Sequence, residues 1–265
     1  MPLTRLNKFI SRRSPEVNDG SAEGPVSVAA ATLPEGQRAY VIGDIHGRKD
    51  LLSSLLDKIA RDRAAKEKAD THLIFLGDYV DRGPDSAGVI NMLLALDQSD
   101  MNVITLKGNH EAAMRSFLQD PVKGKRWLYY GGDATLRSYG VDFALRDITE
   151  DKIVQAGRKL RKNLPDSHLK FICSLKSSHM IGDYFFVHAG IEPGKSIDNQ
   201  KEHDLLWIRD AFLEHEGLYE KVIVHGHSII PEPELKDNRI GIDTGAFYSN
   251  LLTCLVLEGG TKEIL

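Results

Sequence analysis

The stretch GDYVDRGPDS, residues 77–86, directly follows the apolar run LIFL at residues 73–76. It places Asp78, Asp81 and Arg82 within five residues, at the point where a predicted buried strand ends. A carboxylate in such a place is costly unless positive charge meets it, because burying an unpaired charge is strongly unfavourable. The stretch therefore indicates a cation close to these aspartates.

The same kind of polar end follows four other apolar runs. GDIHG (43–47), GNHE (108–111), FVHAG (186–190) and VHGHS (224–228) each place aspartate, asparagine or histidine beside glycine. Helix-like segments follow the first three predicted strands, which is typical of βαβ units and a largely parallel sheet; they span residues 51–69, 86–95 and 111–118. Because sites form at the carboxyl ends of strands in open α/β sheets, we expect the five polar ends to converge.

The side chains at these ends indicate the kind of cation. Carboxylate, imidazole and amide oxygen without thiolate suit manganese, iron or zinc rather than a structural zinc cage. About six ligands exceed what one tetrahedral metal needs, whereas two ions about 3.5 to 4 Å apart that share one carboxylate would use them all. A single such motif is commonly a turn or a helix cap, but five in strand order favour a dinuclear site.

Composition argues against several classes of protein. The chain has 265 residues and a formal net charge of -4, so no global basic field suggests nucleic-acid binding. No apolar stretch approaches the ~18 residues that span a bilayer, and we find no secretion signal, so we expect a cytoplasmic protein without stable membrane insertion. Neither Cys173 nor Cys254 is followed after five residues by arginine, as the cysteine phosphatase mechanism would require.

The chain divides into a predicted tail and one predicted domain. Residues 1–35 mix charged residues with Ser, Gly, Pro and Ala, which is typical of a disordered tail. A short basic amphipathic helix near its start is the alternative interpretation. Residues 36–265 form the predicted domain, in which residues 120–170 break the strand–helix rhythm. We interpret that segment as a helical insertion that could cover a site.

The five polar motifs together resemble the phosphoprotein phosphatase family of metallophosphoesterases, and within it the bacterial serine/threonine protein phosphatase branch. The resemblance rests on GDIHG, GDYVDRG, GNHE, HAG and HGHS and spans about residues 39–257. It implies an α/β fold, a calcineurin-like metallophosphatase sandwich of two mixed β-sheets flanked by helices, with a dinuclear metal centre at one edge.

The resemblance also implies a role for each matching residue. Asp44 and His46 would bind the first ion, Asp78 would bridge, and the second ion would be completed by Asn109, His188 and His227. The expected ions are Mn²⁺, with iron or zinc as alternatives. A hydroxide bridging the two ions would attack phosphorus directly, without a phosphoenzyme intermediate.

Four further residues would handle the proton and the phosphate. His110 would protonate the leaving oxygen as general acid, held by Asp81. Arg82 would bind the phosphate, and Arg209 in LLWIRD matches the second phosphate-binding arginine of the bacterial branch. Paired arginines suit the charge spread over phosphate oxygens.

Three assignments stay open at this point. His225 competes with His227 for one ligand position, and the family pattern favours His227 because it stands between glycine and serine. Asp243 either orients a ligand or caps a turn, and we favour the turn. Tyr129 and Tyr130 either line the mouth of the site or pack inside the insertion.

We expect a metal-dependent protein serine/threonine phosphatase whose substrates are phosphorylated proteins or peptides. Dinucleoside polyphosphate hydrolases share the same motifs, since specificity lies in insertions and loops, so they are the first alternative. A non-catalytic scaffold is the second, although all the predicted ligands are present. AGIEPGKS at 189–196 resembles a P-loop, but Glu192 and Pro193 suit a phosphate cradle poorly.

Overall fold

Two stacked β-sheets form the centre of the protein. The computed structural model describes residues 24–96, 100–146 and 148–265. The first sheet has the order β10-β9-β1-β2-β3, with β1, β2 and β3 parallel and the other two antiparallel. Its strands are β1 (Gln37–Ile42), β2 (Asp70–Phe75), β3 (Asn102–Thr105), β9 (Cys254–Glu258) and β10 (Thr261–Ile264).

The second sheet has the order β4-β5-β6-β8-β7. Its central strands β5, β6 and β8 are parallel, while the edge strands β4 and β7 are antiparallel. The strands are β4 (Ser178–Ile181), β5 (Tyr184–Val187), β6 (Val222–His225), β7 (Glu234–Leu235) and β8 (Arg239–Gly241). Both sheets are therefore mixed, as the resemblance implied.

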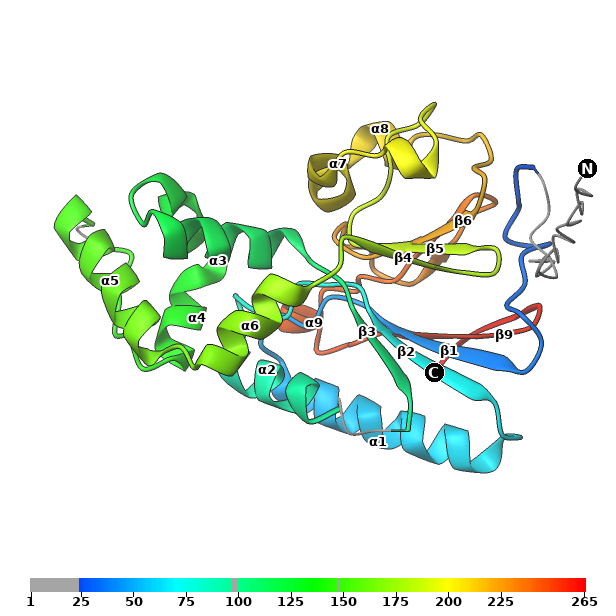
Figure 1. The fold of residues 1–265 in the computed structure, drawn as a ribbon, viewed down its shortest axis with the longest axis horizontal. Coiled ribbons are helices and arrows are strands. Elements are labelled where there is room, and N and C mark those ends of the chain that lie inside the picture. The colour runs from blue at the N-terminus through cyan, green and yellow to red at the C-terminus, as the bar shows by residue number, and fades with distance from the viewer. Residues whose placement is uncertain (1–23, 97–99, 147) are drawn as a thin grey trace, which may run out of the picture.

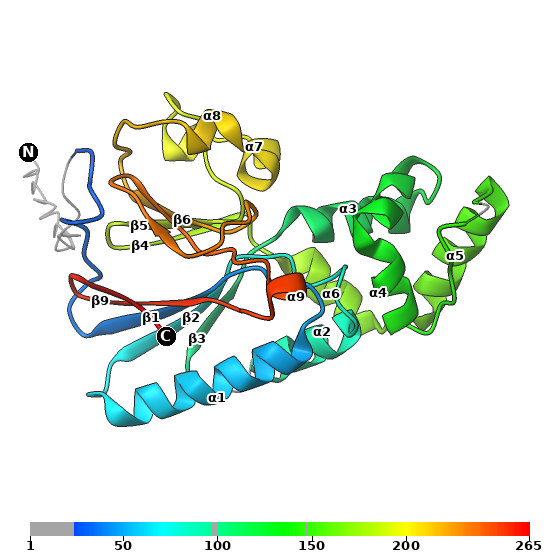
Figure 2. The same ribbon diagram turned by 180° about the vertical axis from the view of Figure 1, so that it is seen from behind.

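The alternation of side chains along each strand explains the layered arrangement. In β1, Val41 belongs to the apolar cluster between the two sheets, whereas Tyr40 and Ile42 belong to the cluster on the helix side. Successive strand residues point to opposite faces, so a strand buried on both faces is apolar throughout. Figures 1 and 2 show α1 (Lys49–Ala65) and α2 (Ser86–Ala95) against the first sheet, with α7 and α8 against the second.

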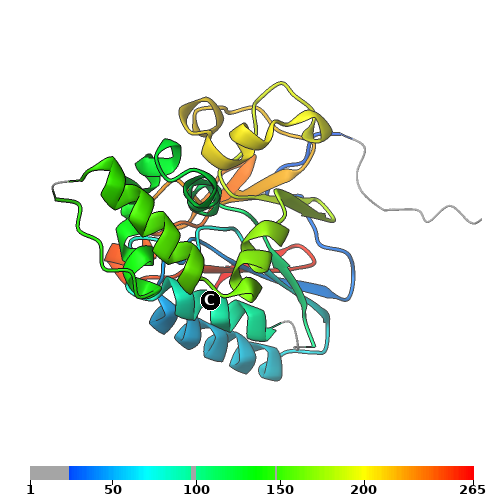
Figure 3. The same cartoon turned by 60° about the vertical axis from the view of Figure 1, so that its left-hand side comes forward.

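The segment predicted to be an insertion is helical, and its last helix runs on to Ser174. Its helices follow α3 (Asn109–Gln119) and gather at one end of the two sheets (Figure 3). They are α4 (Asp133–Ser138), α5 (Glu150–Asn163) and α6 (Asp166–Ser174), preceded by a 3₁₀ turn at Lys123–Lys125 and a turn at Leu128–Gly132 that is kinked at Gly131. In α5 the Thr149 hydroxyl caps the first turn and Ile153, Ala156 and Leu160 form the buried face.

The described end of the predicted tail packs against the sheets. Residues 1–23 lie outside the described residues, but Val26 pairs with Tyr219, and the side chains of Val28, Ala31 and Leu33 are buried between the sheets. The packed chain thus includes residues 24–35, ahead of the predicted boundary at residue 36. Their apolar side chains follow no helix or strand period, so the sequence pattern did not reveal them. The division into tail and domain otherwise stays a prediction.

Two short helices, rather than one, lie within residues 202–213. α7 (Glu202–Trp207) and α8 (Asp210–Leu213) are separated at Ile208, with ψ of 145°, and Arg209, with φ of -135° and ψ of -104°. The break leaves Arg209 exposed between the two helices. A last short helix, α9 (Ala246–Ser249), follows β8. Among the residues described, no helix has the length and apolarity needed to cross a bilayer.

Candidate metal centre

The five polar strand ends meet in one place, as expected. Asp44 and His46 follow β1, Asp78 follows β2, and the remaining residues come from the start of α3 and the ends of β5 and β6. None of the predicted ligands, nor the predicted general acid and its partner, is more than 6% exposed; the set is Asp44, His46, Asp78, Asp81, Asn109, His110, His188 and His227.

Asp78 lies at the centre of this cluster. Its Oδ2 atom is 3.5 Å from Nε2 of His46 and 3.8 Å from Nε2 of His110, and its Oδ1 atom is 3.5 Å from Nε2 of His188. Two groups capable of holding an ion share this residue, one with His46 and His110 and one with His188 and His227. A bridging position for Asp78 is consistent with both.

Lone pairs face one another in the second group. The Nδ1 atom of His188 lies 3.0 Å from the carbonyl oxygen of Leu76, which can only accept, so Nδ1 carries the proton. Its Nε2 atom therefore presents a lone pair, 2.8 Å from the amide oxygen of Asn109. Nδ1 of His227 approaches the same oxygen at 3.1 Å. The lone pairs of His188 Nε2 and the Asn109 oxygen, placed this closely, indicate a cation between them, whereas Nδ1 of His227 can donate to the same oxygen.

In the part of the chain that the structure describes, the surroundings of His46 and Asp44 also lack a positive charge that would satisfy their acceptor atoms. Nδ1 of His46 donates to the carbonyl oxygen of Val80 at 2.8 Å, while its buried Nε2 has no hydrogen-bond partner among the described residues. Burial, together with Asp243 and Asp78, raises the pKa of Asp44 well above its usual value. Asp44 itself accepts the backbone N–H of His227 at 3.2 Å. Oxygen and imidazole ligands of this kind fit divalent ions.

The backbone at the site is strained. His46, Asp78, Asp81, Arg82 and His227 have φ values of 46°, 53°, 75°, 66° and 61°, in the left-handed region that non-glycine residues rarely adopt. Each such residue costs on the order of 1 kcal/mol and persists only where its surroundings hold it. Of the non-glycine residues with positive φ in the described chain, Asn250 alone lies outside the predicted site.

His110 is paired with Asp81 as the resemblance implied. Nδ1 of His110 lies 2.7 Å from Oδ2 of Asp81. Burial lowers the pKa of His110, but the charge of Asp78 and the hydrogen bond to Asp81 outweigh it, so the pKa is raised overall. Since Nδ1 faces the carboxylate, Nε2 remains to carry a proton toward a substrate.

The two predicted phosphate-binding arginines are exposed and lie near different histidines of the cluster. Arg82 stacks its guanidinium 4.7 Å from the ring centre of Phe247, which in turn lies 5.5 Å from the ring of His46. Arg209 donates from Nη1 to the hydroxyl of Ser228 at 3.3 Å. Arg82 interacts electrostatically with His46, and Arg209 with His188 and His227.

The residues left open by the sequence take distinct places. His227, rather than His225, belongs to a group around Asp78; His225 packs its ring 5.0 Å from Phe212. Asp243 accepts the Gly245 N–H at 2.9 Å, the predicted turn, and burial raises its pKa to about 6.

The two tyrosines are not packed inside the insertion. Tyr129 is 63% exposed. Tyr130 is 40% exposed and lies 6.4 Å from the His110 ring and 6.2 Å from the Trp207 ring, measured between ring centres. Tyr130 therefore belongs to the mouth of the site.

The P-loop alternative does not fit the structure. β5 ends at Val187, and the GKS sequence is followed by a 3₁₀ turn at Ile197–Asn199 rather than by an α-helix. Lys195 pairs with Glu192 within the same loop. The strand–loop–helix arrangement that cradles phosphate is absent from this part of the described chain.

Sequence reasoning missed the residues that hold the site in place. The Glu111 carboxylate accepts the backbone N–H groups of Asp78, Tyr79, Val80 and Gly108 at 2.8 to 3.2 Å. The available signal was a glutamate three residues after Gly108, at the start of a predicted helix. Trp127 and Thr135, which contact Asp81, gave no signal, because they lie 46 and 54 residues away in the chain.

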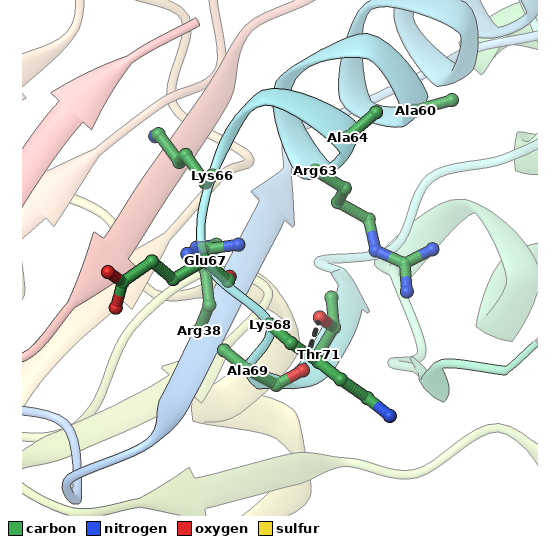
Figure 4. Close-up of a pocket in the computed structure, with 9 residues that line it drawn as sticks. All are labelled: Arg38, Ala60, Arg63, Ala64, Lys66, Glu67, Lys68, Ala69 and Thr71. Atoms are coloured by element: carbon green, nitrogen blue, oxygen red, sulfur yellow. Dashed lines mark hydrogen bonds between the residues drawn. The ribbon is translucent and has the colours of Figure 1, made fainter.

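A separate hollow lies at the opposite ends of the strands. It has a volume of about 310 Å³ and is lined by residues near the start of β1 and β2 and the end of α1 (Figure 4). Three of its four cations, Arg38, Arg63 and Lys66, pair with Glu258, Asp100 and Asp62 at 2.7, 3.0 and 3.1 Å. We interpret this hollow as part of the protein's surface structure and not as a catalytic site.

A two-sheet sandwich with a histidine and aspartate cluster at its strand ends defines a metallophosphoesterase. The chain belongs to the calcineurin-like phosphoesterase family, whose sequence model matches residues 37–246. This agrees with the fold and with the family resemblance of the motifs.

Relatives within the family have different names. Serine/threonine-protein phosphatase 2 of Escherichia coli (strain K12) is 28% identical over 223 residues, covering 81% of this chain and 90% of the relative. Bis(5'-nucleosyl)-tetraphosphatase PrpE [asymmetrical] of Oceanobacillus iheyensis is 26% identical over 233 residues, covering 80% of this chain and 86% of the relative.

A solved structure described as a putative diadenosine tetraphosphatase superposes with a TM-score of 0.58 at 20% identity, covering 89% of this chain and 97% of that chain. A cold-active protein tyrosine phosphatase superposes with a TM-score of 0.53 at 19% identity, covering 88% of this chain and 81% of that one. At this identity the two structures support the fold alone.

Proposed function

We propose that this protein is a metal-dependent protein phosphatase that hydrolyses phosphoserine and phosphothreonine in proteins or peptides. Hydrolysis is supported by one observation above all: hydrogen-bond acceptors face one another around Asp78. The His110–Asp81 pair lies beside them, and two exposed arginines lie at the edge of the cluster. The protein substrate is supported by the relative named serine/threonine-protein phosphatase 2, 90% of which this chain covers.

The buried cluster would hold two divalent ions, with Mn²⁺ as the expected metal and iron or zinc as alternatives. When bound, such ions supply Lewis acidity and a water activated near neutral pH. Asp78 would be shared, with Asp44 and His46 on one side and Asn109, His188 and His227 on the other.

Arg82 and Arg209 would bind the phosphate before the reaction. Arginine guanidinium groups make charge-assisted, often bidentate hydrogen bonds to phosphate oxygens. Phe247 beneath Arg82 and Ser228 beside Arg209 restrict where these guanidinium groups can lie. Because both arginines are exposed, they remain accessible to a phosphate carried on a peptide.

His110 would supply the proton that the leaving group needs. A water oxygen forms a bond to phosphorus and loses a proton to solvent, while the bond from phosphorus to the leaving oxygen breaks. The electron pair stays on the leaving oxygen, which takes the proton from Nε2 of His110. The products are inorganic phosphate and the serine or threonine hydroxyl, and His110 regains its proton from solvent.

Dinucleoside polyphosphate hydrolysis is the second candidate. Relatives named bis(5'-nucleosyl)-tetraphosphatase PrpE support it, and so does the pair of rings formed by Tyr130 and Trp207 beside His110. A nucleobase can stack on aromatic side chains of this kind.

The two candidates are separated by comparing kcat/KM for phosphoserine and phosphothreonine peptides with kcat/KM for diadenosine tetraphosphate, all with Mn²⁺. The proposal expects the larger value for a phosphopeptide. A larger value for diadenosine tetraphosphate would replace it with the second candidate. The absence of turnover on every substrate, with no metal bound, would favour a non-catalytic scaffold.

A further inference from the structure

We propose that Trp127 and Thr135, both in the helical insertion, are positioning residues for proton transfer by His110. The inference rests on the proposed function, in which His110 is the general acid. It gives the insertion a part in the reaction itself, beyond covering the site.

Three buried side chains hold the Asp81 carboxylate. Nε1 of Trp127 donates to Oδ2 of Asp81 at 2.7 Å, the same oxygen that Nδ1 of His110 approaches at 2.7 Å. The Thr135 hydroxyl donates to Oδ1 at 2.6 Å. Two of the three donors therefore come from the insertion, and each is buried, with Trp127 1% exposed and Thr135 0% exposed.

Thr135 also fixes the backbone of Asp81. Its hydroxyl oxygen accepts the Asp81 backbone N–H at 2.8 Å, and the hydroxyl of Ser86 accepts the same group at 3.1 Å. A hydroxyl has one donor and two acceptor sites, so donation to Oδ1 and acceptance from the backbone are compatible.

The insertion contacts the strained backbone next to Asp81 as well. The N–H of Arg82 donates to the carbonyl oxygen of Gly131 at 3.1 Å, within the kinked turn that links Trp127 to Thr135. Gly131 has φ of 103°, and a Cβ there would come within 2.7 Å of the Arg82 nitrogen. Because Asp81 and Arg82 have left-handed backbone, these contacts oppose their relaxation.

A carboxylate held in this way keeps Oδ2 at Nδ1 of His110 and leaves Nε2 to carry the proton. Loss of the Trp127 donor frees one lone pair of Oδ2 and lets the carboxylate rotate. This rotation should slow proton transfer from His110 and leave substrate binding unchanged. A substrate whose leaving oxygen is strongly basic depends on that transfer more than one whose leaving oxygen is weakly basic.

The first test is Trp127→Phe, which keeps an aromatic ring against Phe117, 4.9 Å away between ring centres, and removes the N–H. We expect kcat to fall on the order of tenfold more for phenyl phosphate than for p-nitrophenyl phosphate, with KM unchanged. Thr135→Val, which removes the donor to Oδ1, is the second variant and should give the same asymmetry. Equal losses for both substrates, or a change in KM alone, would overturn the inference.

The matched control is Tyr139→Phe. Tyr139 also lies in the insertion and is 7% exposed; its hydroxyl, the group that the variant removes, bonds His168 at 2.8 Å and not Asp81 or the side chains that hold Asp81. The Tyr139→Phe variant also loses one buried side-chain hydrogen bond. The ratio of kcat for phenyl phosphate to kcat for p-nitrophenyl phosphate should nevertheless stay at the wild-type value. An altered ratio would show that the asymmetry reports general loosening of the insertion and would overturn the inference.

A second readout needs no turnover. The proton on Nδ1 of His110, in its 2.7 Å bond to Asp81, should give a low-field ¹H NMR signal in metal-free protein, assigned by its loss in His110→Asn. Trp127→Phe and Thr135→Val should shift this signal, and Tyr139→Phe should not. A signal that stays in place in both variants would overturn the inference. An inactive wild type would contradict the proposed function without touching this measurement.

Discussion

Nε2 of His46 faces Oδ2 of Asp78 across 3.5 Å, and neither atom has a proton to offer the other. The proton of His46 lies on Nδ1, bound to the carbonyl oxygen of Val80. The two side chains are therefore not joined by a hydrogen bond, as their proposed roles as metal ligands require. This preorganised geometry is the basis of the predictions that follow.

Asp78→Asn should weaken the binding of both ions together, because Asp78 belongs to both groups. Elemental analysis after gel filtration should find clearly fewer than two metals per chain. Asp183→Asn is the control, since Asp183 is also a buried aspartate, at 8% exposed, but binds Thr32 instead. A variant at position 78 that keeps both metals would contradict the shared role.

His110→Asn should lower kcat by about 10² to 10⁴, the usual effect of losing acid–base catalysis. Metal content should stay at the wild-type level, because the proposal assigns His110 to the proton and not to an ion. Steady-state kinetics on a phosphopeptide and elemental analysis of the same sample check both parts. An unchanged kcat would remove His110 from the mechanism.

Arg82→Ala and Arg209→Ala should each weaken binding of inorganic phosphate as a competitive inhibitor. A hydrogen bond to a charged group contributes about 1.5 to 3 kcal/mol, so the inhibition constant should rise about tenfold to a hundredfold. Lysine at either position should restore only part of the affinity, since it lacks the bidentate geometry. Alanine at the exposed Arg146 is the control; if it had the same effect, general loss of positive charge would be the cause.

Glu111→Ala should destabilise the metal-free protein, because the backbone N–H groups of Asp78, Tyr79, Val80 and Gly108 lose their acceptor. Leaving buried donors unpaired costs on the order of 3 kcal/mol in total, measurable as a lower urea midpoint. Glu263→Ala, whose side chain is 58% exposed and pairs weakly with Lys66, should change the midpoint little. Equal midpoints for the two variants would refute the bracing role of Glu111.

The sequence predicted that the polar strand ends would lie together, but not which residues would support them. Asp78, Asn109 and His188 follow apolar strands, and the parallel sheets bring such ends to one edge. Trp127 and Thr135 could not be predicted, because their partner Asp81 is reached only once the insertion has folded over it.

The missed elements of the fold have similarly local explanations. β10, TKEI, is an edge strand with exposed polar residues, so it carries no apolar alternation. Residues 202–213 do not form one continuous helix because the backbone leaves helical geometry at Ile208 and Arg209, where Arg209 lies beside Ser228. β10 is held by a short hairpin with its neighbour β9, whereas the break between α7 and α8 accompanies a contact with a segment distant in the chain.

Anomalous diffraction at the manganese edge, from crystals grown with Mn²⁺, tests the central claim most directly. The account predicts two peaks, one on either side of the Asp78 carboxylate, the first beside His46 and the second beside His188 and His227. A single peak, peaks at other side chains, or an empty cluster in the presence of abundant Mn²⁺ would contradict it.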